Sequence, residues 1–178
     1  MINVKNQKGG KMHDEAQKII NFMDTVEGLC YIKRHAWMKN AHKETYTDHV
    51  MKLGFLVMMV SEYIKQPIDR LKVLEMALWH DLVEVEATQH SYFMQMNDPE
   101  IRQMKKDEER KSIEGFRDRL PAPLGQKIYD LLMEYEENKT LEARLVKILN
   151  IVEGNMQYNK ELYGARYYGP SGYTVAQE

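Results

Sequence analysis

The segment Leu78-Trp79-His80-Asp81-Leu82-Val83-Glu84 decides the fold and the chemistry that we expect of this chain. It ends an apolar helical pattern and brings a histidine, an aspartate and a glutamate together. In an α-helix, His80 and Glu84 would share a face because residues four apart are neighbours, and Asp81 would lie beside them. Imidazole and carboxylate ligands together suit Mn, Fe, Co, Ni or Zn, whereas Mg prefers oxygen alone. The segment therefore predicts a metal site, although an ordinary charged helix end would show the same residues.

Length and composition narrow the class of protein. The chain has 178 residues, of which 43% are hydrophobic, and this suits one domain with a well-buried core. Its formal net charge of -2 gives no strong basic field for nucleic acid. The single cysteine, Cys30, excludes an internal disulfide and a cysteine-based zinc site. Because no apolar run could span a bilayer or serve as a signal peptide, we expect a soluble, cytoplasmic protein whose main partner is neither nucleic acid nor a membrane.

Helix caps and hydrophobic periodicity predict an all-α protein. Long helices are expected to begin at Asp14, at the capping box Thr45–Asp48, at Asp69, at Asp98-Pro99 and at Thr140. Pro67 is expected to end the second of them, and residues 31–43 are expected to form an irregular connection. The predicted organisation is a tail over residues 1–12, one helical domain over residues 13–162 and a Tyr- and Gly-rich tail over residues 163–178.

Two polar residues lie within apolar helical patterns. His49 follows the capping box, and a single histidine in such a place is more often a hydrogen-bonded core residue than a ligand. Asn150 interrupts a run between Leu145 and Val152 that is apolar on nearly every side, which is typical of a helix running through the core. Its amide needs partners, so it either bonds neighbouring side chains or faces a polar site.

The order of these residues is more specific than any one of them. Arg34, His49, the pair His80-Asp81, Glu84 and the run from Glu142 to Asn150 together resemble the HD-domain superfamily of metal-dependent phosphohydrolases. Within it, the chain is most similar to the small all-helical 5'-deoxynucleotidases, the YfbR-like and HD-domain-containing 2 proteins, over residues 14–159. The resemblance implies a compact HD-domain helical bundle, a nucleotide substrate and a homodimer.

The resemblance also implies a set of ligands and catalytic groups. The metal ligands are His49, His80, Asp81 and Asn150, with Mn, Co, Fe, Ni or Zn expected rather than Mg. The family has an aspartate at the position of Asn150, so this chain offers an amide oxygen without the negative charge. Glu84, beside Asp81, matches the glutamate that helps to activate the attacking water, and Arg34 matches an arginine that contacts phosphate.

Other departures concern the substrate pocket. The family's tryptophan next to the arginine is His35 here, with Trp37 two residues on, and Gln89 lies where the family has a Gly-Asp step. We expect these three residues to contact substrate. Three functions stay open: a nucleotidase acting on deoxyribonucleoside 5'-monophosphates, a dATP-type triphosphohydrolase of the phage kind, and a catalytically silent nucleotide-binding protein. Asn150 reflects either a natural drift toward weak or absent catalysis or an introduced substitution.

Overall fold

The computed structural model of the protein describes residues 4–38, 42–88 and 97–168, and the side chains of residues 11–38, 42–88 and 97–158. This part of the chain contains six α-helices, two short 3-10 helices and one β-hairpin, so the mostly helical class expected from the sequence is confirmed. It divides into two compact units. The first is formed by the residues up to Leu29 and by Leu82–Met133, and the second by Cys30–Asp81 and the residues from Glu134 onward.

The first unit contains α1 (Val4–Glu27), α5 (Pro99–Arg119) and most of α6 (Ala122–Glu137), and its chain also passes through η1 (Gly28–Cys30). Phe22 of α1 packs edge-to-face on Phe116 of α5 with ring centroids 5.6 Å apart, and the Arg119 guanidinium lies over both rings. The Asp98 side chain accepts hydrogen bonds from the first backbone N–H groups of α5, so the predicted helix start at Asp98-Pro99 is confirmed.

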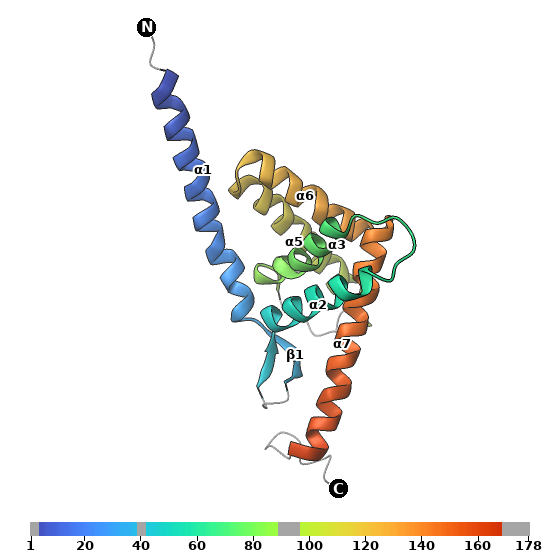
Figure 1. The fold of residues 1–178 in the computed structure, drawn as a ribbon. Coiled ribbons are helices and arrows are strands. Elements are labelled where there is room, and N and C mark those ends of the chain that lie inside the picture. The colour runs from blue at the N-terminus through green and yellow to red at the C-terminus, as the bar shows by residue number, and fades with distance from the viewer. Residues whose placement is uncertain (1–3, 39–41, 89–96, 169–178) are drawn as a thin grey trace. The chain divides into compact units, whose positions relative to one another are not determined.

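The second unit consists of strands β1 (Lys33–Trp37) and β2 (Lys43–Thr45) and of helices α2 (Tyr46–Ser61), α3 (Arg70–Trp79) and α7 (Leu141–Tyr168). The three helices pack on one another, and the antiparallel hairpin contacts α2 and α7 (Figure 1). Their contact buries apolar side chains that are at most 1% exposed: Leu53, Val57, Val73, Met76, Ala143 and Val146. This core holds the ends of α2 and α3 in fixed positions, and the candidate site lies at those ends.

The capping predictions in the second unit are confirmed. Thr45 and Asp48 form a complete capping box at α2, and Asp69 accepts from the backbone N–H of Lys72 at α3. Thr140 Oγ1 accepts from the backbone N–H of Ala143 at 3.2 Å and so caps α7. Each cap satisfies backbone donors that a helix start leaves without a partner, which is why the sequence locates these starts well.

Several expected boundaries were wrong. Helix α1 begins at Val4 rather than Asp14, although Gly9-Gly10 lie inside it and each glycine costs about 1 kcal/mol relative to alanine. Residues 31–43 are not irregular throughout, because β1 and the start of β2 lie within them. Helix α7 extends to Tyr168. The division into one domain and two tails stays a prediction.

Helix interiors also differ from expectation. Helix α2 ends at Ser61, six residues before Pro67, so proline does not end it. Ile148 and Ile151 of α7 are 58% and 65% exposed, so this helix does not run through the core as its composition indicated.

None of the described helices is long and apolar enough to cross a membrane.

The segment after α3 is a 3-10 helix, η2 (His80–Val85), rather than a continued α-helix. Side chains three residues apart eclipse in a 3-10 helix. The α-helical spacing that predicted a common face for His80 and Glu84 therefore does not apply here.

Candidate metal centre

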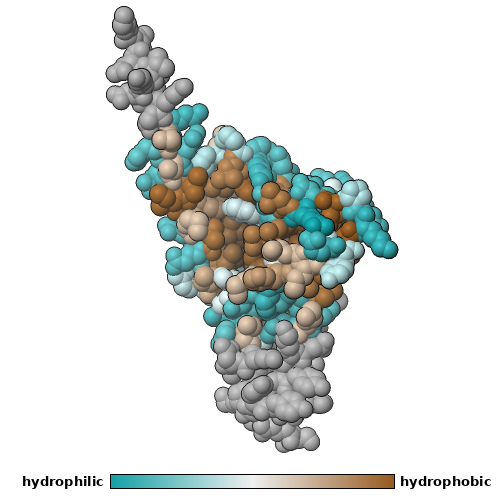
Figure 2. Space-filling view, viewed as in Figure 1, coloured by the Kyte–Doolittle hydropathy of each residue, from teal (hydrophilic) through white to brown (hydrophobic). Residues whose placement is uncertain are grey.

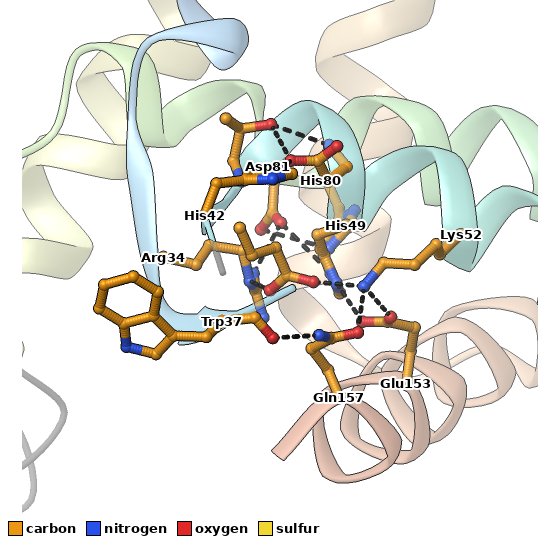
Figure 3. A network of polar contacts seen from close by, with 12 residues as sticks. Arg34, Trp37, His42, His49, Lys52, His80, Asp81, Glu153 and Gln157 are labelled. Atoms are coloured by element: carbon orange, nitrogen blue, oxygen red, sulfur yellow. Dashed lines mark hydrogen bonds and ion pairs between the residues drawn. The ribbon is translucent and has the colours of Figure 1, made fainter. Parts of the chain in front are cut away.

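Three buried side chains of the second unit meet at the ends of α2 and α3. His49 lies in the first turn of α2, just after the capping box, and His80 and Asp81 follow α3 directly. His49 Nε2 lies 3.5 Å from Asp81 Oδ2, and His80 Nε2 lies 3.2 Å from Asp81 Oδ1 (Figure 3). The structure therefore brings together three of the four residues that the sequence predicted as ligands, His49, His80 and Asp81.

The hydrogen bonds of the two histidines define their tautomers. His49 Nδ1 lies 2.5 Å from Glu153 Oε2, and His80 Nδ1 lies 2.9 Å from the backbone oxygen of Ala77. A carboxylate and a carbonyl only accept, so both Nδ1 atoms carry the hydrogen and donate it. Both Nε2 atoms then offer a lone pair, and neither has a hydrogen-bond partner among the described residues.

This donor set fits a divalent transition metal. Buried polar atoms normally have partners, so two buried imidazole lone pairs facing one carboxylate need an explanation. A cation bound by His49, His80 and Asp81 would supply it, because one ligand atom from each of the three residues lies within 4.8 Å of the others. Two imidazole nitrogens and one carboxylate oxygen suit Mn, Fe, Co, Ni or Zn better than Mg.

The protonation states agree with ligand roles. Burial lowers the pKa of His80 below its ordinary value of 6.5, and the charge of Asp81 opposes this shift without reversing it. His80 is therefore neutral at pH 7, as a metal ligand must be. Burial alone would raise the pKa of Glu153, but hydrogen bonds from His49 and Lys52 bring it below its ordinary value of 4.5. Glu153 is a carboxylate at neutral pH.

A second acidic cluster, formed by Glu44, His49 and Glu153, lies on the Nδ1 side of His49. Lys52 is the cation that contacts both carboxylates of this cluster. Its ammonium donates to Glu153 Oε1 at 2.8 Å, to Gln157 Oε1 at 2.9 Å and to Glu44 Oε1 (Figure 3). The sequence did not predict a role for Glu44 or Glu153. The available signal was that Glu153 and Asn150 are three residues apart on one helix, and so share a face.

Arg34 of β1 lies against the centre. Its Nε donates to Glu44 Oε2 at 3.0 Å and its Nη1 lies 3.4 Å from Asp81 Oδ2. The ring of Tyr46 lies beneath the guanidinium, with 5.2 Å between the ring centroid and Cζ. The Arg34 side chain is 22% exposed, so one side of a fixed cation faces outward beside the candidate ligands.

The other predicted substrate contacts are placed differently. His35 is exposed, and it follows Arg34 on a strand, where successive side chains point to opposite faces. Trp37 is half-buried; its backbone oxygen accepts from Gln157 at 2.6 Å, and its ring lies 5.8 Å from Lys43 Nζ. Gln89 lies outside the described residues. None of the three is shown to bind substrate.

Asn150 is joined to the centre through an aromatic ring. Its Nδ2 donates to Tyr135 OH at 3.3 Å, and the Tyr135 ring centroid lies 5.2 Å from that of His80. The amide thus bonds a neighbouring side chain, one of the two alternatives open from the sequence. Its assignment as a fourth ligand stays a prediction.

Glu84 belongs to the first unit. It is 8% exposed, and its Oε1 accepts from Lys105 Nζ at 2.8 Å. Burial alone would lower the pKa of Lys105, but the charges of Glu84 and Glu109 raise it, so Lys105 is a cation at neutral pH. The catalytic role of Glu84 stays a prediction.

Known proteins resemble this chain over most of its length. A family model described as "HD domain" matches residues 26–173. The 5'-deoxynucleotidase HDDC2 of Dictyostelium discoideum is 32% identical over 136 residues, which cover 72% of this chain and 69% of the relative. The human protein of that name is 26% identical over 147 residues, which cover 80% and 67%.

Solved structures share the fold. A predicted metal-dependent phosphohydrolase from Magnetospirillum magnetotacticum matches with a TM-score of 0.73 at 20% identity, over 88% of this chain and 76% of the other. A conserved hypothetical protein from Pyrococcus furiosus matches with a TM-score of 0.65 at 29% identity, over 88% and 86%. Together with the buried histidines and aspartate, these matches place the chain in the HD-domain phosphohydrolase family, as a distant relative of the HDDC2 5'-deoxynucleotidases.

Proposed function

We propose that this protein is a metal-dependent 5'-nucleotidase that releases phosphate from deoxyribonucleoside 5'-monophosphates. The observation that carries the proposal is the pair of buried Nε2 lone pairs, on His49 and His80, that face the Asp81 carboxylate. The substrate class is supported by the HDDC2 relatives, which are described as 5'-deoxynucleotidases. The metal is one of Mn, Co, Fe, Ni or Zn, with Asn150 as its fourth, uncharged ligand.

Each residue has a defined task in this reaction. A divalent cation at the centre would polarise the phosphate and lower the pKa of a water molecule. Arg34 binds the non-reacting phosphate oxygens, because its planar guanidinium can make two parallel hydrogen bonds and already lies 3.4 Å from Asp81. Glu84, which matches the family's water-activating glutamate, takes up the proton of the attacking water. Trp37 provides an apolar surface for the nucleoside.

The test is hydrolysis of deoxyribonucleoside mono- and triphosphates with Mn, Co or Mg. Orthophosphate released from monophosphates supports the nucleotidase, whereas tripolyphosphate released from dATP would support the triphosphohydrolase instead. His80→Ala should abolish release, because it removes a ligand. His13→Ala is the matched control, since the His13 side chain is 80% exposed and lies in the first unit. Equal activity of both variants would refute the assigned centre.

Asn150 supports one alternative, a nucleotide-binding protein without turnover. An amide oxygen lacks the negative charge of the family's aspartate, so the metal should bind more weakly. Calorimetry that shows nucleotide binding, with no hydrolysis by the parent or by Asn150→Asp, would favour this alternative. Turnover that appears only in Asn150→Asp would identify a nucleotidase whose metal centre is weakened in this chain.

We also propose that the protein forms a homodimer. Helix α2 exposes Met51, Phe55 and Met58 by 55%, 61% and 52%, a spacing of four and three residues that forms one apolar stripe. Exposed hydrophobic residues are also visible in the space-filling view (Figure 2). Exposed apolar stripes of this kind often mark protein interfaces. Light scattering coupled to size exclusion would give twice the chain mass of 21.1 kDa if the homodimer forms.

A further inference from the structure

The side of His49 that faces away from Asp81 is fixed by a buried carboxylate. Nδ1 lies 2.5 Å from Glu153 Oε2, while Nε2 lies 3.5 Å from Asp81 Oδ2. The other tautomer would place a hydrogen on Nε2 and leave the Nδ1 lone pair against the carboxylate oxygen. A rotated ring would break the bond to Glu153. One ring orientation and one tautomer are therefore selected together.

Glu153 is itself held in place by a network of charged and polar groups. Its Oε1 accepts from Lys52 Nζ at 2.8 Å, and the same ammonium donates to Gln157 Oε1 at 2.9 Å. Gln157 lies one helical turn after Glu153 on α7, and its Nε2 donates to the backbone oxygen of Trp37 at 2.6 Å. The hairpin, α2 and α7 thus all contribute to the position of one carboxylate (Figure 3).

The same network decides between two possible places for a cation. Glu44, His49 and Glu153 could form a second metal site, because their ligand atoms lie within 4.8 Å of one another. Lys52 already donates to both carboxylates there, so a metal ion would face a like charge at short range. On the Nε2 side, Arg34 Nη1 lies 3.4 Å from Asp81 Oδ2, but His49 and His80 both offer lone pairs there, whereas Nδ1 of His49 carries a hydrogen that it donates to Glu153. The Nδ1 side supports the centre rather than forming a second one.

We propose that Glu153 is a positioning residue for His49, which is taken as a metal ligand of the proposed function. Its carboxylate fixes the tautomer and orientation of the ring, and Lys52 fixes the carboxylate. A carboxylate hydrogen-bonded to a ligating histidine also makes the imidazole a stronger donor. Glu153 therefore offsets part of the metal affinity that is lost when Asn150 replaces a charged ligand.

Two measurements made in the absence of nucleotide test the positioning role of Glu153. Nitrogen-15 NMR of the metal-free protein reports which ring nitrogen of His49 carries hydrogen, and absorption titration with Co²⁺ reports metal affinity. We expect the Nδ1–H form in the parent, and its loss in Glu153→Ala together with a Co²⁺ Kd about 10–100-fold higher. Glu153→Gln should keep the Nδ1–H form, because its amide oxygen still accepts, and should lose less affinity.

Glu142→Gln is the matched control. Glu142 lies on the same helix as Glu153, and its side chain is 16% exposed. Its Oε2 lies 3.8 Å from Nζ of a different lysine, Lys72. Its substitution should leave the His49 tautomer and the Co²⁺ Kd unchanged within about twofold, since it touches no ligand. Titrations are repeated with Asn150→Asp in each variant, so that weak binding by the parent does not hide the effect.

Three outcomes would overturn the inference. They are an Nε2–H tautomer of His49 in the parent, equal Co²⁺ affinity of the parent and Glu153→Ala, and an equal loss in Glu142→Gln. If Glu153→Ala does not fold, the parent spectrum and Glu153→Gln decide the question. A failure of the proposed function would give a different result. If Co²⁺ binding depends on Glu153 but no nucleotide is hydrolysed, the positioning role of Glu153 stands and the nucleotidase proposal is refuted.

Discussion

Replacing Lys52 with methionine would measure how far the buried cluster around His49 supports the fold. The side chains of Glu44 and Glu153 are 1% and 6% exposed, and the Lys52 ammonium donates to both. Methionine keeps most of the apolar stem but leaves the two carboxylates without that cation. Removing one partner of a buried ion pair costs about 3–5 kcal/mol. We expect about 3 kcal/mol, the lower end, because Lys52 is only partly buried and Arg34 still binds Glu44.

The assay is urea denaturation followed by circular dichroism at pH 7. The matched control is Lys72→Met, because Lys72 also contacts two glutamates, Glu134 and Glu142. Those side chains are 24% and 16% exposed, so solvent screens that cluster more strongly. We expect the control to lose about 0–1 kcal/mol. Similar losses for both lysines would refute the conclusion that burial makes the Lys52 cluster important.

The ionisation of Glu153 determines how the stability difference between the parent and Lys52→Met depends on pH. Its pKa is lower in the folded protein than its ordinary value of 4.5. The stability that it contributes is therefore complete above that value and is lost as the pH falls through the folded-state pKa. The stability difference between the parent and Lys52→Met should be largest near neutral pH and should narrow in acid. A constant difference across that range would contradict the role of the ionised carboxylate.

Three further predictions concern function. Asn150→Asp should lower the Co²⁺ Kd by about tenfold or more, because a carboxylate replaces a neutral oxygen; unchanged calorimetric affinity would remove Asn150 from the ligand set. Arg34→Met should raise the KM for a deoxyribonucleoside monophosphate by about 10–100-fold, the cost of a charge-assisted hydrogen bond to phosphate; steady-state kinetics with an unchanged KM would contradict this. Phe55→Lys should give a monomer in light scattering, whereas a persistent dimer would place the interface elsewhere.

Three residues of the candidate centre were predictable because each has a local signal. His80 and Asp81 are adjacent in sequence, and the capping box at Thr45 locates His49 in the first turn of α2. The signal for Glu153 was weaker, because its spacing from Asn150 shows only a shared helix face, its partner His49 is 104 residues away, and glutamates on helices are usually solvated. Only the packing of α7 against α2 makes it part of the centre.

Local structure was predictable where side chains cap the backbone and less so elsewhere. Caps at Thr45, Asp69, Asp98 and Thr140 located four helices, since they act over three residues. The hairpin was missed because β2 has only three residues, too few to show an alternating pattern. A 3-10 segment at a helix end has the same composition as an α-helical one, so η2 could not be distinguished by sequence.

As the proposed fourth ligand, Asn150 would affect the substrate as well as the metal. Among His49, His80, Asp81 and Asn150, only Asp81 carries a negative charge, and Arg34 lies 3.4 Å from it. With a divalent cation in place, the centre facing a phosphate is therefore one unit more positive than it would be with aspartate at this position. The metal would then bind less tightly, whereas an anionic nucleotide or its phosphate product would bind more tightly and leave more slowly. The proposed nucleotidase and the alternative, a silent nucleotide-binding protein, would thus differ by the charge of one side chain, and the proposed role of Glu153 at His49 would shift that balance back toward metal binding.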